Sequence, residues 1–344
     1  MVLGISVSKK RAAVAALLVI SGSVWLLGQE RQRRGPGDGQ RGPGNRPQRM
    51  QAIELPEAEV KIYTEGEYRF IESNGVPDHD HGEFPTRGNP NAIRPQEHRY
   101  RVPLNPVASE EPTPAHGGIF GVAINGIPFE PGTAERFENN PQSNWHYEAL
   151  TGHLNLGIDE NNAHVQPSGT YHYHGLPTGL IHKHGDEEGI TLLGYAADGF
   201  PVYSNIGYAK AGDASSELKE LRSSYALKEG ARPVGEDGPG GEYDGRFTQD
   251  WEYVEGAGDL DAFNGRFGVT PEYPDGIYHY YVTDEFPYIS RMFKGKPDET
   301  FLRRRGGGGG PRGRGPGGRG GPRGPRGPRG EGPPRGGPPP QDRG

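Results

Sequence analysis

The sequence predicts a mainly β fold, with antiparallel sheets arranged like a sandwich or a barrel, long loops and a few short helices. Short runs of alternating side chains recur along the chain, among them VKIYTE, YRFIES, IFGVAI, TYHYH and IYHYYV. Gly, Pro, Asn or Asp bounds each run, as expected for strands that end in turns. The stretch AINGIPFEP is typical of two strands joined by a tight turn at Asn125-Gly126.

One segment has the pattern of a helix instead. Residues 213–230, DASSELKELRSSYALKEG, begin with Asp213, a residue type that caps helices well, and end at Gly230. Leu218, Leu221 and Tyr225 would fall on one face of such a helix. We therefore expect a helix over this segment.

Both ends of the chain have compositions that exclude a hydrophobic core. Residues 306–344 contain no aliphatic or aromatic side chain, and residues 31–52 are nearly as rich in Gly, Pro, Arg and Gln. Such low-complexity segments cannot bury enough apolar surface to fold. We expect a disordered linker over residues 31–52, one domain over residues 53–305 and a disordered basic tail over residues 306–344.

The N-terminal segment has the pattern of an export signal. Lys9, Lys10 and Arg11 precede an apolar run over residues 12–28, whose 17 residues are also at the short limit for a membrane-spanning helix. We expect residues 1–30 to form a signal or anchor segment, with residues 12–28 holding the body at the membrane outside the cytoplasm. The alternative is a cleaved signal and a secreted or periplasmic body.

Charge is distributed unevenly along the chain. Residues 1–50 hold nine Lys/Arg against two acids and residues 303–344 eleven Arg against two acids, which leaves 18 basic and 41 acidic residues between them. An acidic body argues against nucleic acid as a partner and suits divalent cations or plain solubility. The basic tail could contact anionic envelope polymers, or serve only to keep the protein soluble.

The absence of cysteine limits the chemistry of any site. Thiolate zinc sites, iron–sulfur clusters, disulfides and cysteine nucleophiles are all excluded. A metal would have to be held by imidazole, carboxylate, amide or backbone oxygen, and nitrogen and oxygen ligands suit zinc or copper(II).

Histidines recur in His-x-His pairs more often than chance predicts, with three pairs among twelve histidines. Strand residues two apart share a face, so GTYHYH would place His172 and His174 on one face and two tyrosines on the other. His164 lies just upstream, and His79 belongs to a second pair, with His81. The third pair, HKH at residues 182–184, is typical of an exposed turn.

These histidines are the candidate metal ligands, and packing is the alternative at each position. Imidazoles two apart on a strand can reach one ion, whereas histidines between aromatics are also common core residues bonded to backbone. GIYHYY at residues 276–281 resembles GTYHYH, which predicts that the two strands lie close and that His279 approaches His172. Candidate bases for a metal-activated water are Asp159, Glu160 and Asp198.

Several of these stretches together resemble a known family. The runs AHVQPSGTYHYHGLP and LLGYAADGFPVYS, with GVAINGIPFEP and GIYHYYVTDEFPYISRMFKG, closely resemble the YHYH domain proteins, exported bacterial proteins named for this motif. The resemblance spans residues 60–295. It implies an exported domain and draws attention to residues 171–174, but names no substrate.

The sequence therefore predicts an exported, membrane-anchored domain that binds a divalent transition metal, zinc or copper, through a histidine cluster. An enzymatic role would require an open position on the metal. The alternative is a non-catalytic structural or adhesive envelope module in which the Tyr and His stripes form the core.

Overall fold

The computed structural model describes residues 49–115 and 118–301. The predicted signal or anchor segment, nearly all of the predicted linker and the predicted basic tail lie outside the described residues. The described part is mainly β, as predicted, and contains one α-helix. Within these two ranges, no helix is long and apolar enough to cross a membrane.

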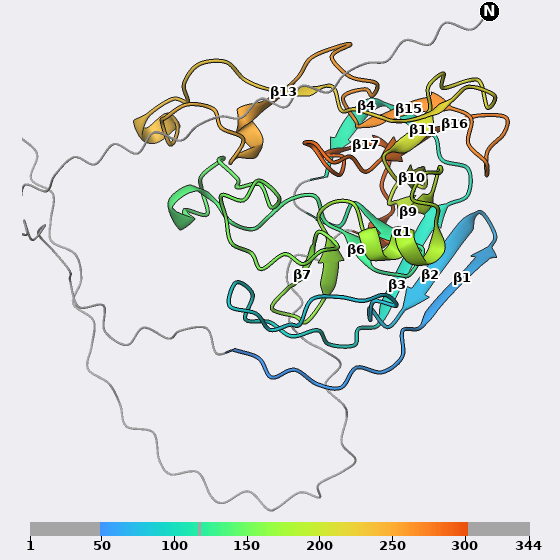
Figure 1. Cartoon of the computed structure of the whole chain (residues 1–344), viewed down its shortest axis with the longest axis horizontal. Helices are drawn as coiled ribbons and strands as arrows, with labels where there is room; N and C mark the ends of the chain where they lie inside the picture. Colours follow the sequence, from blue (N-terminus) through green and yellow to red (C-terminus); the bar gives the residue numbers. More distant parts are fainter. Residues whose placement is uncertain (1–48, 116–117, 302–344) are drawn as a thin grey trace, which may run out of the picture. The chain divides into compact units, whose positions relative to one another are not determined.

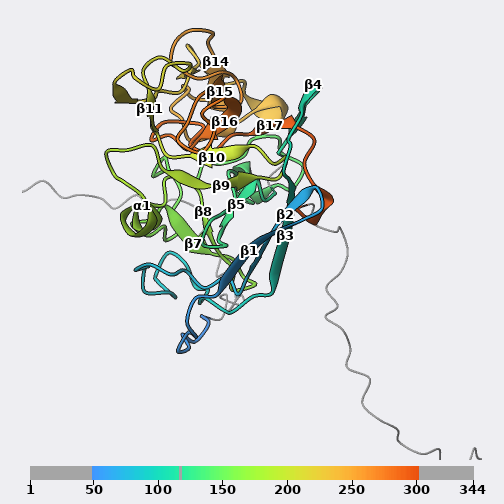
Figure 2. The same ribbon diagram turned by 90° about the vertical axis from the view of Figure 1, so that its right-hand side faces the viewer.

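Eight strands form one curled, mixed sheet. Its strand order is β15-β16-β10-β9-β5-β6-β8-β7, and Figure 2 labels every one of these strands except β6. Two neighbouring pairs, β6 with β8 and β10 with β16, are parallel, and the others are antiparallel. The bounds are β5 (Gly121–Ala123), β6 (Pro128–Phe129), β7 (Ala163–Val165), β8 (Tyr171–Tyr173), β9 (Leu192–Ala196), β10 (Pro201–Tyr203), β15 (Gly265–Gly268) and β16 (Ile277–Tyr281).

A three-stranded antiparallel sheet packs onto the same core, drawn in blue and teal in Figure 1. It consists of β1 (Val60–Glu65), β2 (Tyr68–Ser73) and β3 (His98–Pro103). Tyr100 and Val102 of β3 are buried in the main core, while Arg99 before them is exposed and Arg101 between them is half-buried. This alternation is the one expected of an antiparallel sheet with one face on a core.

The remaining elements are short. Three further strand pairs, β4 with β17, β11 with β12 and β13 with β14, and the single α-helix lie around the two sheets. Their bounds are β4 (Ala108–Pro114), β17 (Met292–Gly295), β11 (Ile206–Tyr208), β12 (Leu218–Glu220), β13 (Tyr225–Leu227), β14 (Trp251–Tyr253) and α1 (Thr178–His184), with single 3₁₀ turns at Phe137–Asn139, Gly235–Asp237, Thr248–Asp250 and Glu299–Phe301.

The predicted turn at Asn125-Gly126 is confirmed. It joins β5 to β6, and the amide of Gly126 donates to the carbonyl of Ala123 at 2.8 Å. Gly126 has φ +79°, a conformation that side chains with a Cβ rarely adopt. Gly126 therefore occupies a turn position whose backbone conformation favours glycine.

The helix predicted over residues 213–230 is wrong. The segment forms β12 and β13, which pair with β11 and β14. Asp213 closes a turn, accepting from the amide and hydroxyl of Ser215, and the buried Ser224 hydroxyl donates to the carbonyl of Leu260. Bonds to other parts of the fold thus override a weak helical propensity.

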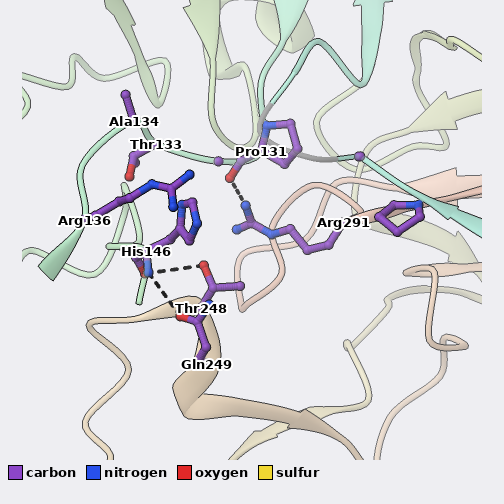
Figure 3. A pocket seen from close by; sticks show the side chains of 11 residues that line it. Pro131, Thr133, Ala134, Arg136, His146, Thr248, Gln249 and Arg291 are labelled. Atoms are coloured by element: carbon purple, nitrogen blue, oxygen red, sulfur yellow. Dashed lines mark hydrogen bonds between the residues drawn. The ribbon is translucent and has the colours of Figure 1, made fainter. Parts of the chain in front are cut away.

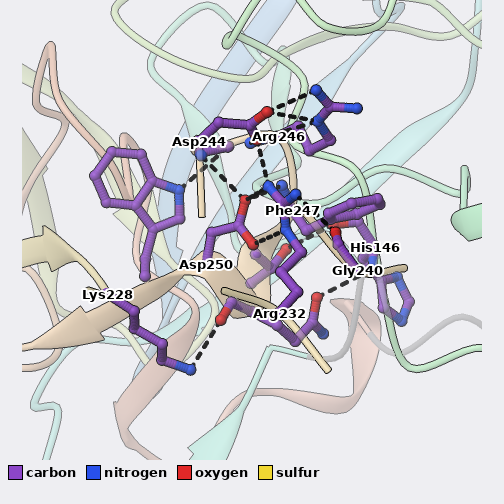
Figure 4. Close-up of polar contacts among 12 residues, drawn as sticks. His146, Lys228, Arg232, Gly240, Asp244, Arg246, Phe247 and Asp250 are labelled. Carbon is purple, nitrogen blue, oxygen red and sulfur yellow. Dashed lines mark hydrogen bonds and ion pairs between the residues drawn. The ribbon is translucent and has the colours of Figure 1, made fainter. Parts of the chain in front are cut away.

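A buried ion pair holds the loops around β13 and β14. Figure 4 shows the guanidinium of Arg232 against the carboxylate of Asp250, with Nε to Oδ1 at 2.7 Å and Nη2 to Oδ2 at 2.6 Å. Oδ2 also accepts from the amides of Gly245 and Phe247. The side chains of Arg232 and Asp250 are only 3% and 0% exposed, so each charge depends on the other.

We predict that Asp250→Asn lowers the free energy of unfolding by about 3 kcal/mol or more, because it leaves a buried guanidinium without its main counter-charge. Chemical denaturation measures this loss. The control is Asp244→Asn, since Asp244 also contacts Arg232 but is 34% exposed and shared with Arg246. Equal losses in the two variants would contradict the importance of the buried pair.

Candidate metal centre

Three histidines meet on the β7–β8 hairpin. His164 in β7 pairs directly with His172 in β8, and His174 follows just beyond the strand. The ring centroids are 4.6 Å apart for His164 and His172, 4.9 Å for His164 and His174, and 4.7 Å for His172 and His174. One nitrogen from each ring lies within 4.8 Å of the others. We call these three residues the histidine cluster.

Hydrogen bonds determine which ring nitrogens carry protons. Nδ1 of His164 lies 3.0 Å from the carbonyl oxygen of Leu156, and Nδ1 of His172 lies 3.3 Å from that of Thr170. A carbonyl only accepts, so both Nδ1 atoms donate and both Nε2 atoms present lone pairs. Nε2 of His172 then accepts from Nε2 of His174 at 3.1 Å. Two of the three rings are thus oriented by backbone, as metal-ligating histidines commonly are.

The surroundings of His164 and His174 favour the neutral form of both rings. His172 and His174 are 1% and 2% exposed. Burial, reinforced by the neighbouring His172, lowers the pKa of His164 to about 4, and burial holds the pKa of His174 well below its usual value. Neutral imidazole is the form that can bind a metal, and His164 and His174 present that form at neutral pH.

The cluster opens into a cavity of about 310 Å³. Glu130 lines this cavity; it is 6% exposed, and its Oε2 accepts from Nε2 of Gln166 at 2.6 Å. Glu130 is not among the residues that the sequence pattern indicated. It follows β6, which lies beside β8 through a parallel pairing that no local pattern in the sequence could indicate.

A second cavity, of about 490 Å³, shares the wall formed by Gly132, Thr133 and Ala134 with the first. Figure 3 shows Arg136 beside His146 on this cavity's wall, with Arg291 reaching the carbonyl of Pro131. Nη2 of Arg291 also pairs with the buried Glu148 at 2.6 Å. Cationic side chains therefore lie one loop away from the histidine cluster.

His79 lies on the tyrosine side of β8 and outside the histidine cluster. Its Nε2 contacts the hydroxyl of Tyr173 at 2.5 Å, and its ring packs against Tyr171 and Tyr173. His81 likewise contacts Tyr171. Because successive strand residues face opposite sides, these contacts place His79 across the sheet from His172.

The prediction that His279 approaches His172 is wrong. The two strands do belong to one sheet, but β6, β5, β9 and β10 stand between β8 and β16. Five strand spacings of about 4.8 Å separate them along the sheet, too far for one ion. His279 instead bonds to the carbonyl of Ile277 and the hydroxyl of Tyr281.

None of the predicted bases lies in the cluster's cavity. Asp159 accepts from the hydroxyl of Tyr171 at 2.7 Å, on the tyrosine side of β8. Glu160 is exposed and lines a surface hollow beside His79. Asp198 accepts from the hydroxyl of Tyr280 in β16, and burial raises the pKa of Asp198 to about 6.

The third histidine pair lies at the end of α1 rather than in a turn. His182 contacts Glu187, and Nε2 of His184 contacts the carboxylate of Asp78. Both are exposed, as predicted, and neither belongs to the histidine cluster.

We predict that His279 destabilises the fold in acid. Burial lowers its pKa to about 4, so between about pH 6.5 and pH 4 the unfolded chain binds a proton that the native state does not. The free energy of unfolding therefore falls as the pH is lowered through this window, and this residue accounts for about 3 kcal/mol of the loss at most. Unfolding curves of His279→Gln should fall less steeply there, whereas His182→Gln, at an exposed position, should match the unaltered protein; identical slopes for all three would refute the prediction.

Comparison with known proteins adds a family. A search of the curated proteins and a search of the solved structures gave no match. A family model described as YHYH protein matches residues 99–295, which include all three residues of the histidine cluster. That match covers more than half of the chain, and the chain therefore belongs to the YHYH protein family.

Proposed function

We propose that this protein binds one divalent transition metal ion through His164, His172 and His174. The observation that carries the proposal is the convergence of three imidazoles, two of them buried and one half-buried, whose ligand nitrogens lie within 4.8 Å of one another.

The donor set fits zinc or copper. Two nitrogens bound to one tetrahedral zinc at 2.0–2.1 Å stand about 3.3 Å apart, close to the 3.1 Å between Nε2 of His172 and Nε2 of His174. Those two atoms share one proton, and the buried Nδ1 of His174 makes no hydrogen bond of normal geometry. An ion in place of that proton would let Nδ1 carry a proton beside the backbone of Glu130.

Three protein ligands leave a coordination position open, which is typical of catalytic rather than structural zinc. A zinc ion held by these three imidazoles would lower the pKa of water at that position. Glu130 is buried and lines the same cavity, so it would be the base for such a water. A hydrolytic centre is therefore the enzymatic form of the proposal.

The competing function is a structural or adhesive envelope module in which the histidines only pack. The complete burial of Tyr171 and Tyr173 supports a structural role for that part of the motif.

Location is also part of the proposal: residues 12–28 would hold the body outside the cytoplasm, and the basic tail would contact anionic envelope polymers. Both rest on composition alone.

We predict that zinc or copper(II) raises the melting temperature of the chelator-treated protein. An ion at one hundred times its dissociation constant adds about 2.7 kcal/mol to the native state. His164→Ala, His172→Ala and His174→Ala should each abolish the effect, whereas the control His182→Ala, at an exposed position on α1, should retain it. Identical melts with chelator and with either metal would favour the packing alternative.

We predict that zinc-loaded protein hydrolyses an activated ester such as 4-nitrophenyl acetate faster than metal-free protein does. Glu130→Gln should lower that rate by about 100-fold or more while the zinc content stays unchanged. Glu135→Gln is the matched control, since Glu135 lines the same cavity but is less buried. A full rate in Glu130→Gln removes the role of Glu130, and no metal-dependent rate at all favours the non-catalytic module.

A further inference from the structure

The paired positions of the β15–β16 hairpin correspond to those of the β7–β8 hairpin, although the loop between the strands is longer. In the first, His164 pairs with His172; in the second, Arg266 pairs with His279. Both second strands begin after a glycine with nearly the same backbone, Gly169 at φ +87° and Gly276 at φ +86°.

The turns that precede the two hairpins also match. Asp159 accepts from the amide of Ala163 through Oδ1 at 3.2 Å and from Tyr171 through Oδ2. Asp261 accepts from the amide of Gly265 through Oδ1 at 3.1 Å and from Tyr278. The asparagines at the corresponding turn positions, Asn162 and Asn264, share a left-handed backbone at φ 53° and 55°.

A third pair of segments lies between the hairpins in the sheet. GVAINGIPF at residues 121–129 corresponds to GYAADGFPV at residues 194–202. The side chain of Asn125 contacts the hydroxyl of Tyr173, and that of Asp198 contacts the hydroxyl of Tyr280. Phe129 pairs in parallel with Tyr173, and Val202 pairs in parallel with Tyr280.

The strand order is symmetric about the middle of the sheet. One half runs β5-β6-β8-β7 and the other β9-β10-β16-β15, as Figure 2 shows. In the two central strands, Gly121 pairs with Ala196 and Ala123 pairs with Gly194. Because Gly121 corresponds to Gly194 and Ala123 to Ala196, these two pairs are equivalent. Val122 pairs with Tyr195, its own counterpart, so a two-fold relation passes through this pair.

We propose that the sheet consists of two copies of one module, and that the second copy preserves the framework of the metal site with Arg266, His279 and Tyr281 in place of the histidine cluster. The metal content of the first copy rests on the proposed function; the correspondence of the two copies does not. The protein then binds one ion per chain, and the second copy is a latent site that two substitutions convert.

The contacts inside the second framework follow those of the first. His279 Nδ1 donates to the carbonyl of Ile277 at 2.9 Å, as His172 Nδ1 does to that of Thr170. His279 Nε2 lies 2.7 Å from the hydroxyl of Tyr281, as His172 Nε2 lies 3.1 Å from His174. Nε2 of His279 therefore occupies the position that corresponds to Nε2 of His172, one of the proposed ligand nitrogens.

Two side chains explain why this copy would not hold an ion. Arg266 carries a permanent positive charge and no lone pair, and its Nη2 donates to the carbonyl of Tyr208 at 2.7 Å. Its guanidinium lies 5.4 Å from the ring centre of Tyr281, where the first copy has imidazoles only. Imidazole is smaller than either side chain, so the replacement of both by histidine leaves room.

The test converts the second copy in the full chain and counts zinc bound per chain by elemental analysis and titration calorimetry. The unaltered protein should bind one zinc ion and His172→Ala none. The double variant Arg266→His/Tyr281→His should bind two, and His279→Ala added to it should reduce the count to one. A folded double variant that still binds one overturns the proposal and leaves the first site intact.

Other counts separate this proposal from the proposed function. No zinc in the unaltered protein, with one ion in the double variant that His279→Ala removes, would refute the proposed function and support the duplication. Two ions in the unaltered protein, one of them lost in His279→Ala, would overturn the latent site.

The reverse exchange tests the duplication even if the first variant fails to fold. His164→Arg/His174→Tyr gives the first copy the pair that the second copy already accommodates. This variant should fold, melt within a few degrees of the metal-free protein and bind no zinc. If both exchanged variants are unfolded by circular dichroism, the two frameworks are not equivalent and the proposal fails.

Discussion

The arrangement of the site depends on the hydrogen bond that the hydroxyl of Tyr171 donates to the carboxylate of Asp159. One carboxylate oxygen of Asp159 accepts from backbone amides of the turn, and the other accepts from the tyrosine hydroxyl at 2.7 Å. The turn and the strand that follows it are thereby held in one register. A slip of one residue would turn the tyrosines outward and carry His172 into the core.

That register separates two chemistries across a single strand. The tyrosines point into a core where their hydroxyls are satisfied by Asp159, Asn125 and His79. The histidines line a cavity, and backbone carbonyls orient two of the three rings, those of His164 and His172. Both halves of the alternating motif are buried, and the histidine side also lines a cavity.

Local periodicity was enough to predict the strands, the Asn125-Gly126 turn and the common face of His172 and His174. His164 could be included because a hairpin partner lies close in sequence. Glu130 could not, because its neighbourhood depends on the parallel pairing of β6 with β8, which joins segments about forty residues apart. The same limit explains the error at His279: the sequence shows that two stretches are alike, but not that four strands lie between them.

The correspondence of the two halves also separates structural from functional residues. Both halves retain the two tyrosines, the aspartate turn and the first histidine of the motif, with His172 and His279 each donating Nδ1–H to a backbone carbonyl. These shared features are what the sheet needs in order to form. His164 and His174, in contrast, have Arg266 and Tyr281 as counterparts on an equivalent framework. Folding therefore does not require imidazole at those two positions, and the presence of both in the first half, beside a cavity and a buried carboxylate, calls for a chemical reason such as a bound metal.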